Sequence, residues 1–279
     1  MGGATKRSAA VPSAAHRRGS GEPLLLIHGF TLNWQSWSGV IDELGADFDV
    51  LAPTLPGHWG GPDVDRPLRI ADFVDFLEAC MDAAGWVDAH IAGNSLGGWL
   101  ALELAARGRA RSVTAVAPAG LWRPSDAAAE TVHRKFRSFS RFAPGLRFAS
   151  HPMVPDIARR LILRSFAHRP DLVSADLAAV TIEAPAHCRC FASVTNDPTA
   201  TAVDAMRRVD VPATVLFCER DRVIPPARYG RTILAEMPAI TAKTLPEVGH
   251  VPMLEASDLI ATEIRQFVDS ACGRTRRSA

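Results

Sequence analysis

The chain has 279 residues, of which 47% are hydrophobic, and a formal net charge of +1. This length suits one α/β domain with an inserted piece, and the apolar content is enough for a full core. The near-neutral charge predicts no attraction to nucleic acid, and no apolar run approaches the ~18 residues that a membrane span needs. Residues 1–10 are small, polar and basic, and we expect them to form a disordered tail.

The cysteines predict a reducing environment. They are odd in number and irregularly spaced, at Cys80, Cys188, Cys190, Cys218 and Cys272, which favours free thiols and a cytoplasmic location. The C-x-C pair has no matching pair elsewhere in the sequence, so we expect no zinc site. Arg17-Arg18 precedes an apolar run of only four residues, too short for an export signal.

Strands and helices alternate in the first half of the sequence. Residues 24–27 are wholly apolar, as in a parallel strand buried on both faces, and residues 34–44 have helical spacing. Further strands are expected at residues 48–52, 87–92 and 113–117, and further helices at residues 70–84 and 99–107. This alternation predicts a mostly parallel, doubly wound sheet covered by helices on both faces.

The alternation stops between residues 123 and 210. Helical segments without a convincing strand fill this stretch, which is too long for a loop and therefore predicts an inserted helical cap. Strands at 213–218 and 240–245 and helices at 227–237 and 255–271 then complete the sheet. The predicted division is a core of residues 11–122 and 211–279 and a cap of residues 123–210.

A candidate nucleophile lies where the strand at 87–92 meets the helix that follows it. The connection is Gly93-Asn94-Ser95-Leu96-Gly97, and so sharp a turn needs flanking residues without a Cβ. The helix would direct its free N–H groups and positive dipole end at whatever Ser95 attacks. The strand-turn-helix context therefore predicts that Ser95 is an acyl-transfer nucleophile.

A serine hydroxyl needs a base to activate it and an acid to orient that base. Asp221 follows the strand at 213–218 and His250 follows the strand at 240–245, and the carboxyl ends of parallel strands meet at one edge of a sheet. We therefore predict a triad of Ser95, His250 and Asp221. Glu219 is the competing acid, but it lies closer to its strand and less freely over the edge.

These motifs resemble the α/β-hydrolase superfamily, in its form with a helical cap, over about residues 15 to 270. The motifs that carry the resemblance are His28-Gly29-Phe30, Leu55-Pro56-Gly57-His58, Gly93-Asn94-Ser95-Leu96-Gly97-Gly98, Asp221-Arg222-Val223-Ile224-Pro225 and Gly249-His250-Val251-Pro252. The resemblance implies an oxyanion hole made by the backbone N–H groups of Phe30 and Leu96, and a structural role for His28. It implies no metal and no organic cofactor. Thr54 and Trp59 stand where family members commonly have Asp and Gly, so this loop is expected to differ in shape.

The expected reaction is hydrolysis of a carboxylic ester, lactone or thioester through an acyl-enzyme on Ser95. A carbon–carbon bond hydrolase of the meta-cleavage-product type is the alternative, although many such enzymes have a Trp where this chain has Val251. A non-catalytic binding module is a third class, against which an intact triad argues. An epoxide hydrolase or a dehalogenase would need an acid at position 95, and Ser95 therefore excludes both.

The substrate is expected to be a small apolar or amphipathic carbonyl compound. Proximity along the chain predicts an apolar pocket lined by Phe30, Trp34, Trp122, Val223 and Val251. Residues 133–148 interleave Phe136, Phe139, Phe142 and Phe148 with Arg134, Lys135, Arg137, Arg141 and Arg147. The favoured interpretation is an amphipathic cap helix that buries its aromatic rings; the other is a basic-aromatic surface for an anionic or lipid-like substrate. The sequence leaves the oligomeric state open, and a homodimer is among the options.

Overall fold

The computed structural model describes residues 11–123, 127–148, 154–191, 193, 200–230, 234–237 and 239–274. The predicted disordered tail, residues 1–10, lies outside this range. Among the helices described, none is both long and apolar enough to cross a bilayer.

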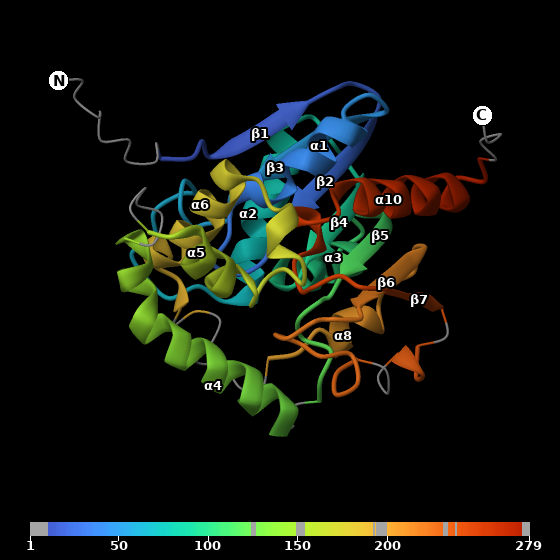
Figure 1. The fold of residues 1–279 in the computed structure, drawn as a ribbon. Helices are drawn as coiled ribbons and strands as arrows, with labels where there is room; N and C mark the ends of the chain where they lie inside the picture. Colours follow the sequence, from blue (N-terminus) through green and yellow to red (C-terminus); the bar gives the residue numbers. More distant parts are fainter. Residues whose placement is uncertain are drawn as a thin grey trace.

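The centre of the molecule is a seven-stranded sheet in the order β1-β3-β2-β4-β5-β6-β7 (Figure 1). The strands are β1 Ala15–Arg18, β2 Glu22–Ile27, β3 Phe48–Pro53, β4 Ala89–Asn94, β5 Ala110–Val116, β6 Ala213–Cys218 and β7 Ile240–Leu245. β1 runs antiparallel to β3, and every other pairing in this sheet is parallel. The predicted fold class is therefore confirmed, and β6 and β7 have the bounds expected from the sequence.

Helices cover both faces of the sheet, as a doubly wound fold requires. Their bounds are η1 Trp34–Trp37, α1 Ser38–Leu44, α2 Ile70–Ala83, α3 Leu96–Ala106, η5 Pro252–Leu254 and α10 Ser257–Ala271. α1 and α10 pack together over one face, and α2 and α3 pack together over the other. The helix expected at residues 227–237 is not seen in residues 227–230, which form turns, and residues 231–233 lie outside the described range.

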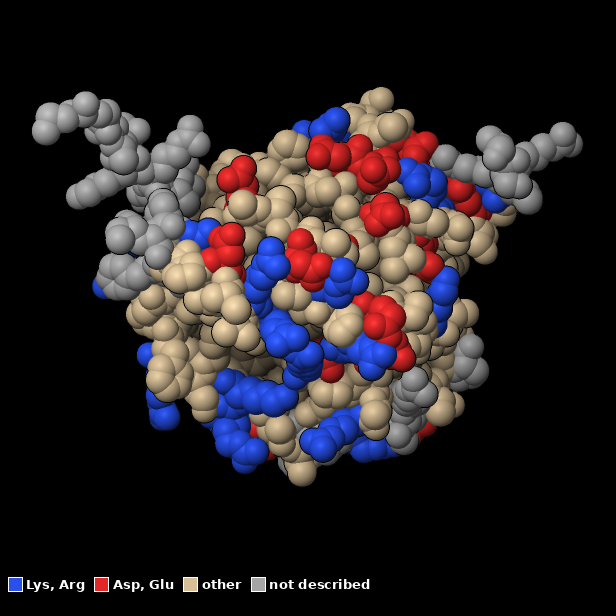
Figure 2. All heavy atoms as spheres, viewed as in Figure 1, with Lys and Arg blue, Asp and Glu red and all other residues tan. Residues whose placement is uncertain are grey.

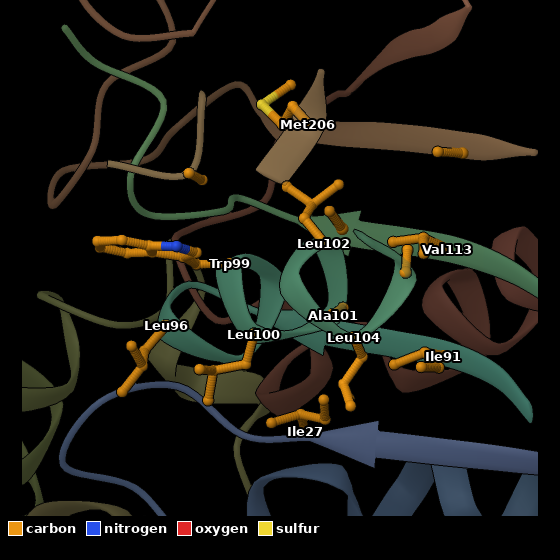
Figure 3. Close-up of a cluster of buried hydrophobic side chains, with 14 of the residues drawn as sticks. Ile27, Ile91, Leu96, Trp99, Leu100, Ala101, Leu102, Leu104, Val113 and Met206 are labelled. Carbon is orange, nitrogen blue, oxygen red and sulfur yellow. The ribbon is translucent and has the colours of Figure 1, made fainter. Parts of the chain in front are cut away.

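α3 is apolar on nearly all sides because it is enclosed on nearly all sides. In Figure 3, Leu100 and Leu104 point toward Ile27 and Ile91 in the sheet, whereas Leu102 points toward Met206. The helix that carries the candidate nucleophile at its start is thus fixed between the sheet and a later part of the chain.

The expected helical insertion is present between β5 and β6. Its described elements are α4 Ala127–Phe142, η2 Ala143–Phe148, α5 Asp156–Leu163, η3 Pro170–Leu172, α6 Ala175–Glu183, η4 Ala184–His187 and α8 Val203–Met206. α4 joins the hydrophobic cluster around α2 and α3, whereas α5 and α6 join the cluster around α1. The insertion therefore spans both sides of the sheet edge where the predicted catalytic residues lie (Figure 1).

Candidate active site

Ser95 occupies a strained turn between β4 and α3. Its backbone angles are φ 54° and ψ −114°, a region that residues other than glycine rarely adopt. Its N–H donates to Val116 O over 2.9 Å, and its carbonyl accepts from the Ala119 N–H over 3.0 Å. The turn is therefore held by the end of the neighbouring strand β5, and Ser95 is 4% exposed.

The two glycines beside this turn have the steric role that the sequence predicts. A Cβ on Gly93 would lie 2.1 Å from Gly97 O, and a Cβ on Gly97 would lie 2.2 Å from Ile27 O. Both clashes are with backbone, which no side-chain rotation can relieve. Glycine at position 93 therefore lets the start of α3 fold back on β4, and glycine at position 97 lets α3 approach β2.

Gly97→Ala should lower the free energy of unfolding by about 3 kcal/mol or more, the upper end of overpacking costs, because backbone must move. Gly145→Ala is the matched control, since a Cβ there would meet nothing within 4 Å, and it should change stability little. Urea denaturation followed by circular dichroism measures both variants. Equal stability of the two would contradict the steric role of Gly97.

His250 and Asp221 form a buried hydrogen-bonded pair. His250 Nδ1 lies 2.7 Å from Asp221 Oδ2, and both residues are about as buried as Ser95. Asp221 Oδ1 accepts from the N–H groups of Val223 and Ile224, at 2.7 and 2.8 Å. Asp221 Oδ2 therefore orients the imidazole, and Asp221 Oδ1 holds the carboxylate in place against the loop after β6.

The competing acid has other partners. Glu219 Oε2 accepts from the Glu247 N–H at 3.0 Å and lies 3.6 Å from the Arg220 guanidinium. Arg220 in turn pairs with Glu247, so the partners of Glu219 belong to an exposed ion-pair cluster rather than to the imidazole. Of the two candidate acids, Asp221 is the one that the structure brings to the imidazole.

Asn94 links the candidate nucleophile to the histidine loop, a contact that the sequence analysis missed. This fully buried side chain donates through Nδ2 to His250 O over 2.9 Å and to Val116 O over 3.2 Å. One amide therefore ties the end of β4, the end of β5 and the loop after β7. A buried amide directly before the nucleophile was the available signal, but its partner is 156 residues away along the chain.

Glu255 is a second residue that the sequence analysis missed. Its Oε1 accepts from the Gly249 N–H at 2.7 Å and from the His168 N–H at 2.9 Å, and its Oε2 accepts from the Arg169 N–H. One carboxylate thereby fastens the histidine loop to the segment that follows α5. The position of His250 thus depends on the insertion as well as on β7.

The loop after β2 passes directly beside Ser95. A Cβ on Gly29 would lie 3.4 Å from Ser95 Cβ and 2.9 Å from Asn94 Oδ1, so this loop also needs glycine to come so close. Leu96 is the first residue of α3, where backbone N–H groups have no partner within the helix. Phe30 and Leu96 thus flank Ser95, and their oxyanion role stays a prediction.

His28 has structural partners on both ring nitrogens. Nε2 accepts from the Leu55 N–H at 2.9 Å, so Nδ1 carries the hydrogen and donates to Gly29 O over 2.8 Å. Burial, aided by the charge of nearby His58, holds the pKa of His28 well below its usual value. A neutral ring with both nitrogens in use supports the structural role expected for His28.

A cavity of about 370 Å³ adjoins the loops that carry Asp221 and His250, although none of the three predicted catalytic residues lines it. Its lining consists of Lys135, Phe136, Phe139, Arg164, Ser165, Phe166, Arg222 and Val223. Val223 N donates to Asp221, and Val251 N donates to Phe166 O over 2.8 Å, which connects the lining to both triad loops. Figure 2 shows Lys and Arg side chains gathered around a hollow on this face of the molecule.

Of the predicted pocket residues, Val223 lines this cavity and the other four do not, although the ring of Phe30 meets that of the lining residue Phe136. Trp34 instead donates to Ser13 O and stacks on His16, because the 3-10 turn η1 directs its ring toward β1. Trp122 is buried, donates to Ala200 O and meets other aromatic rings edge-on. Val251 is 1% exposed and belongs to the core.

The aromatic residues of α4 divide between the two interpretations. Phe136 and Phe139 are half-buried and line the cavity, and Phe136 meets Phe30 edge-on at 5.2 Å. Phe142 is 74% exposed, so the expectation that all these rings are buried was wrong there. The side chain of Phe148 lies outside the described set.

Comparisons with known proteins identify the family of this chain. The family model described as the alpha/beta hydrolase family matches residues 24–263. The curated relatives include epoxide hydrolase EphH of Mycobacterium tuberculosis, 36% identical over 211 residues, covering 75% of this chain and 99% of that protein. They also include the pimeloyl-acyl-carrier protein methyl ester esterase of Neisseria meningitidis serogroup B, 29% identical over 260 residues, covering 88% and 92%.

A solved structure shares the fold. The meta-cleavage product hydrolase of Pseudomonas fluorescens IP01 has a TM-score of 0.70 and 22% identity, covering 92% of this chain and 94% of that one. The family match spans both halves of the sheet and the insertion between them. This chain therefore belongs to the alpha/beta hydrolase family.

Proposed function

We propose that this hydrolase cleaves a carboxylic ester, lactone or thioester through an acyl-enzyme on Ser95. The observation that carries the proposal is the buried His250–Asp221 pair, tied by Asn94 to the strained turn that presents Ser95. His250 Nε2 takes the Ser95 proton as Oγ attacks the carbonyl, and the N–H groups of Phe30 and Leu96 stabilise the oxyanion. The leaving group departs with that proton, and water then repeats the sequence to release the acid.

Reaction with a fluorophosphonate probe tests the proposed nucleophile without knowledge of the substrate. The probe should form a covalent adduct that maps to the peptide containing Ser95, because only an activated serine reacts at a useful rate. Denatured protein is the control and should not be labelled. An adduct on another serine would refute Ser95 as the nucleophile, whereas no adduct on native protein would favour the non-catalytic binding class.

The cavity supports an amphipathic substrate with an anionic group. Lys135, Arg164 and Arg222 line it, and within the described part of the chain none of the three pairs with a carboxylate. Lys135 Nζ donates to Arg222 O at 3.3 Å, and Arg222 donates to Arg164 O at 3.4 Å, so the cations are held near one another. Rings of Phe136, Phe139 and Phe166 supply an apolar wall beside them, which suits a chain that ends in a negative charge.

Arg222→Gln should raise KM about tenfold for an ester whose acyl chain ends in a carboxylate, which is the loss of one charge-assisted contact in a partly solvated site. The matching ester with a neutral end should show little change. Arg207→Gln is the control, because Arg207 pairs with Asp204 on the surface of α8. Steady-state kinetics on the two esters measures the difference. An equal effect on both would contradict recognition of an anionic end.

A carbon–carbon bond hydrolase remains the second candidate. A substrate of the meta-cleavage type carries a carboxylate, which the three cations of the cavity would also suit. Incubation with a 2-hydroxy-6-oxo-dienoate, followed by its visible absorbance, separates the candidates. Rapid loss of that absorbance beside slow ester hydrolysis would favour carbon–carbon cleavage.

The relationship to a protein named as an epoxide hydrolase does not change the proposed chemistry. Attack of a serine oxygen on an epoxide carbon would form an ether, which water does not hydrolyse under the conditions that release an ester. A carboxylate nucleophile would form a hydrolysable ester, but position 95 is serine. We therefore expect no sustained turnover of epoxides, and repeated turnover of styrene oxide would contradict the serine mechanism.

The domain division, the cellular location and the oligomeric state are also proposals. We assign residues 123–210 to a cap over a core of residues 11–122 and 211–279, on the strength of the all-helical elements described between β5 and β6. Five unpaired thiols support a cytoplasmic location, which fractionation of the native host would test. A homodimer remains an open prediction, to be decided by light scattering.

A further inference from the structure

Three potential metal ligands meet where the insertion touches the core. They are His58, in the loop after β3, and Cys188 and Cys190, which follow η4. One ligand atom from each residue lies within 4.8 Å of the other two. His58 and Cys190 are 132 residues apart along the chain, and the C-x-C pair by itself predicted no metal site. Folding therefore supplies the third donor that the linear pattern lacks.

The separations are close to those of a tetrahedral zinc site. Zn–S bonds of about 2.3 Å and Zn–N bonds of about 2.0–2.1 Å at tetrahedral angles place two sulfurs about 3.8 Å apart, and sulfur and nitrogen about 3.6 Å apart. The two Sγ atoms are 3.5 Å apart, and Cys190 Sγ lies 3.4 Å from His58 Nδ1 and 3.8 Å from Nε2. The separations of Cys190 Sγ from its two partners are thus within a few tenths of an ångström of tetrahedral values, and Cys188 Sγ lies within 4.8 Å of a His58 ring nitrogen.

The imidazole of His58 has the tautomer that a metal ligand needs. Its Nδ1 lies 3.1 Å from Pro56 O, and a carbonyl can only accept, so Nδ1 carries the hydrogen and the lone pair is on Nε2. Metal-bound histidines usually donate their other ring N–H to a carbonyl or carboxylate in this way. Gly57 permits the approach of the two segments, because a Cβ there would lie 2.9 Å from Cys190 Cβ.

We propose that His58, Cys188 and Cys190 form a binding site for one Zn²⁺ ion per chain. Two thiolates and an imidazole suit zinc better than magnesium or calcium, which prefer oxygen ligands. Binding releases the two thiol protons to solvent and leaves a fourth position for water on the side of half-buried Cys188. The ion would fasten the insertion to the loop that already joins it through Arg189 N and Gly57 O, at 2.7 Å.

The site adjoins the candidate oxyanion loop. The ring of His58 meets the ring of Phe30 edge-on with centroids 5.8 Å apart, and Phe30 also contacts Phe191 just beyond Cys190. Zinc binding would therefore restrict the movement of His58 and of the segment before Phe191, whose rings pack against Phe30. The proposed zinc site is tested by metal affinity, so the result does not depend on whether the proposed ester hydrolysis is correct.

The experiment measures zinc affinity by competition with a chromophoric chelator, on reduced full-length protein stripped of metal. Wild type should bind one equivalent. Cys188→Ser and His58→Gln should each weaken binding by about 100-fold or more, beyond the 10–100-fold that loss of an outer partner costs. The complex with Co²⁺ should show the near-ultraviolet absorption of a thiolate-to-metal charge transfer in wild type and lose most of it in Cys188→Ser.

Cys272→Ser is the matched control, because Cys272 belongs to a second three-residue cluster among the described residues, with Glu22 and His90, which offers a single thiol. It should retain full affinity. Circular dichroism of each metal-free variant establishes that it folds, and Cys188→Ser is the mildest change since this residue is half-buried. Absence of tight binding in wild type, affinity unchanged in folded Cys188→Ser, or loss in Cys272→Ser would overturn the proposal.

Discussion

Ser95→Ala should reduce kcat for an activated ester by about 10⁶-fold, to a residual rate set by binding and the oxyanion hole alone. The loss is this large because the proposed mechanism runs through a covalent bond to Ser95 Oγ, which alanine cannot form. Hydrolysis of a p-nitrophenyl acylate, followed by release of p-nitrophenolate, measures the effect. The variant should keep its fold, since alanine fits the same turn.

Ser165→Ala is the matched control for this measurement. Ser165 lines the cavity of about 370 Å³ but contacts neither Asp221 nor His250 through any hydrogen bond described. Its removal should leave kcat nearly unchanged. If Ser95→Ala stays within about tenfold of wild type, the acyl-enzyme mechanism is wrong, because no triad enzyme tolerates that loss so mildly.

Asp221→Asn should lower kcat by about 10⁴-fold, through the wrong tautomer of His250. The hydrogen bonds of Asp221 predict how the asparagine amide would be oriented. The oxygen of the new amide would take the two backbone donors, Val223 N and Ile224 N, which now bind Oδ1. Its NH₂ group would then face His250 Nδ1 and donate to it, which moves the ring hydrogen to Nε2. Protonated Nε2 can no longer accept a hydrogen bond from the Ser95 hydroxyl.

Glu219→Gln separates this effect from a general loss of negative charge near β6. Glu219 contacts Glu247 N and Arg220 instead of the imidazole, so its variant should retain near wild-type kcat. Stopped-flow or steady-state kinetics on the same ester measures both. An Asp221→Asn variant as active as Glu219→Gln would remove Asp221 from the triad.

The middle of the sheet was predictable because β2, β3, β4, β5 and β6 are short, largely apolar runs, whereas the edge strand β1 is polar and lacks this signal. β6 and β7 have the expected bounds, but β4 begins at Ala89, two residues later than expected, since Val87 is 83% exposed in the turn before it. α3 begins at Leu96, three residues before the expected start, because two glycines after the nucleophile conceal a helix that tertiary contacts impose.

The candidate triad was predictable because strand ends converge at one edge whatever the details of packing. The pocket was not, since proximity along the chain says nothing of where a side chain points, and Trp34 turns away toward β1. The contacts Asn94–His250 and His58–Cys190 join residues more than a hundred positions apart. No local pattern reports such a pairing, and three-dimensional packing alone creates it.

Under the proposed mechanism, the positive φ of Ser95 lowers the stability of the fold in exchange for reactivity at one residue. A non-glycine residue held in such a conformation costs about 1–3 kcal/mol, and alanine at this position would keep that penalty. Ser95→Gly should release it and raise the melting temperature by about 2–4 °C for each kcal/mol recovered, while leaving an inert protein. A calorimetric scan in which Ser95→Gly melts no higher than Ser95→Ala would show that the surrounding packing, rather than the torsion itself, sets the penalty.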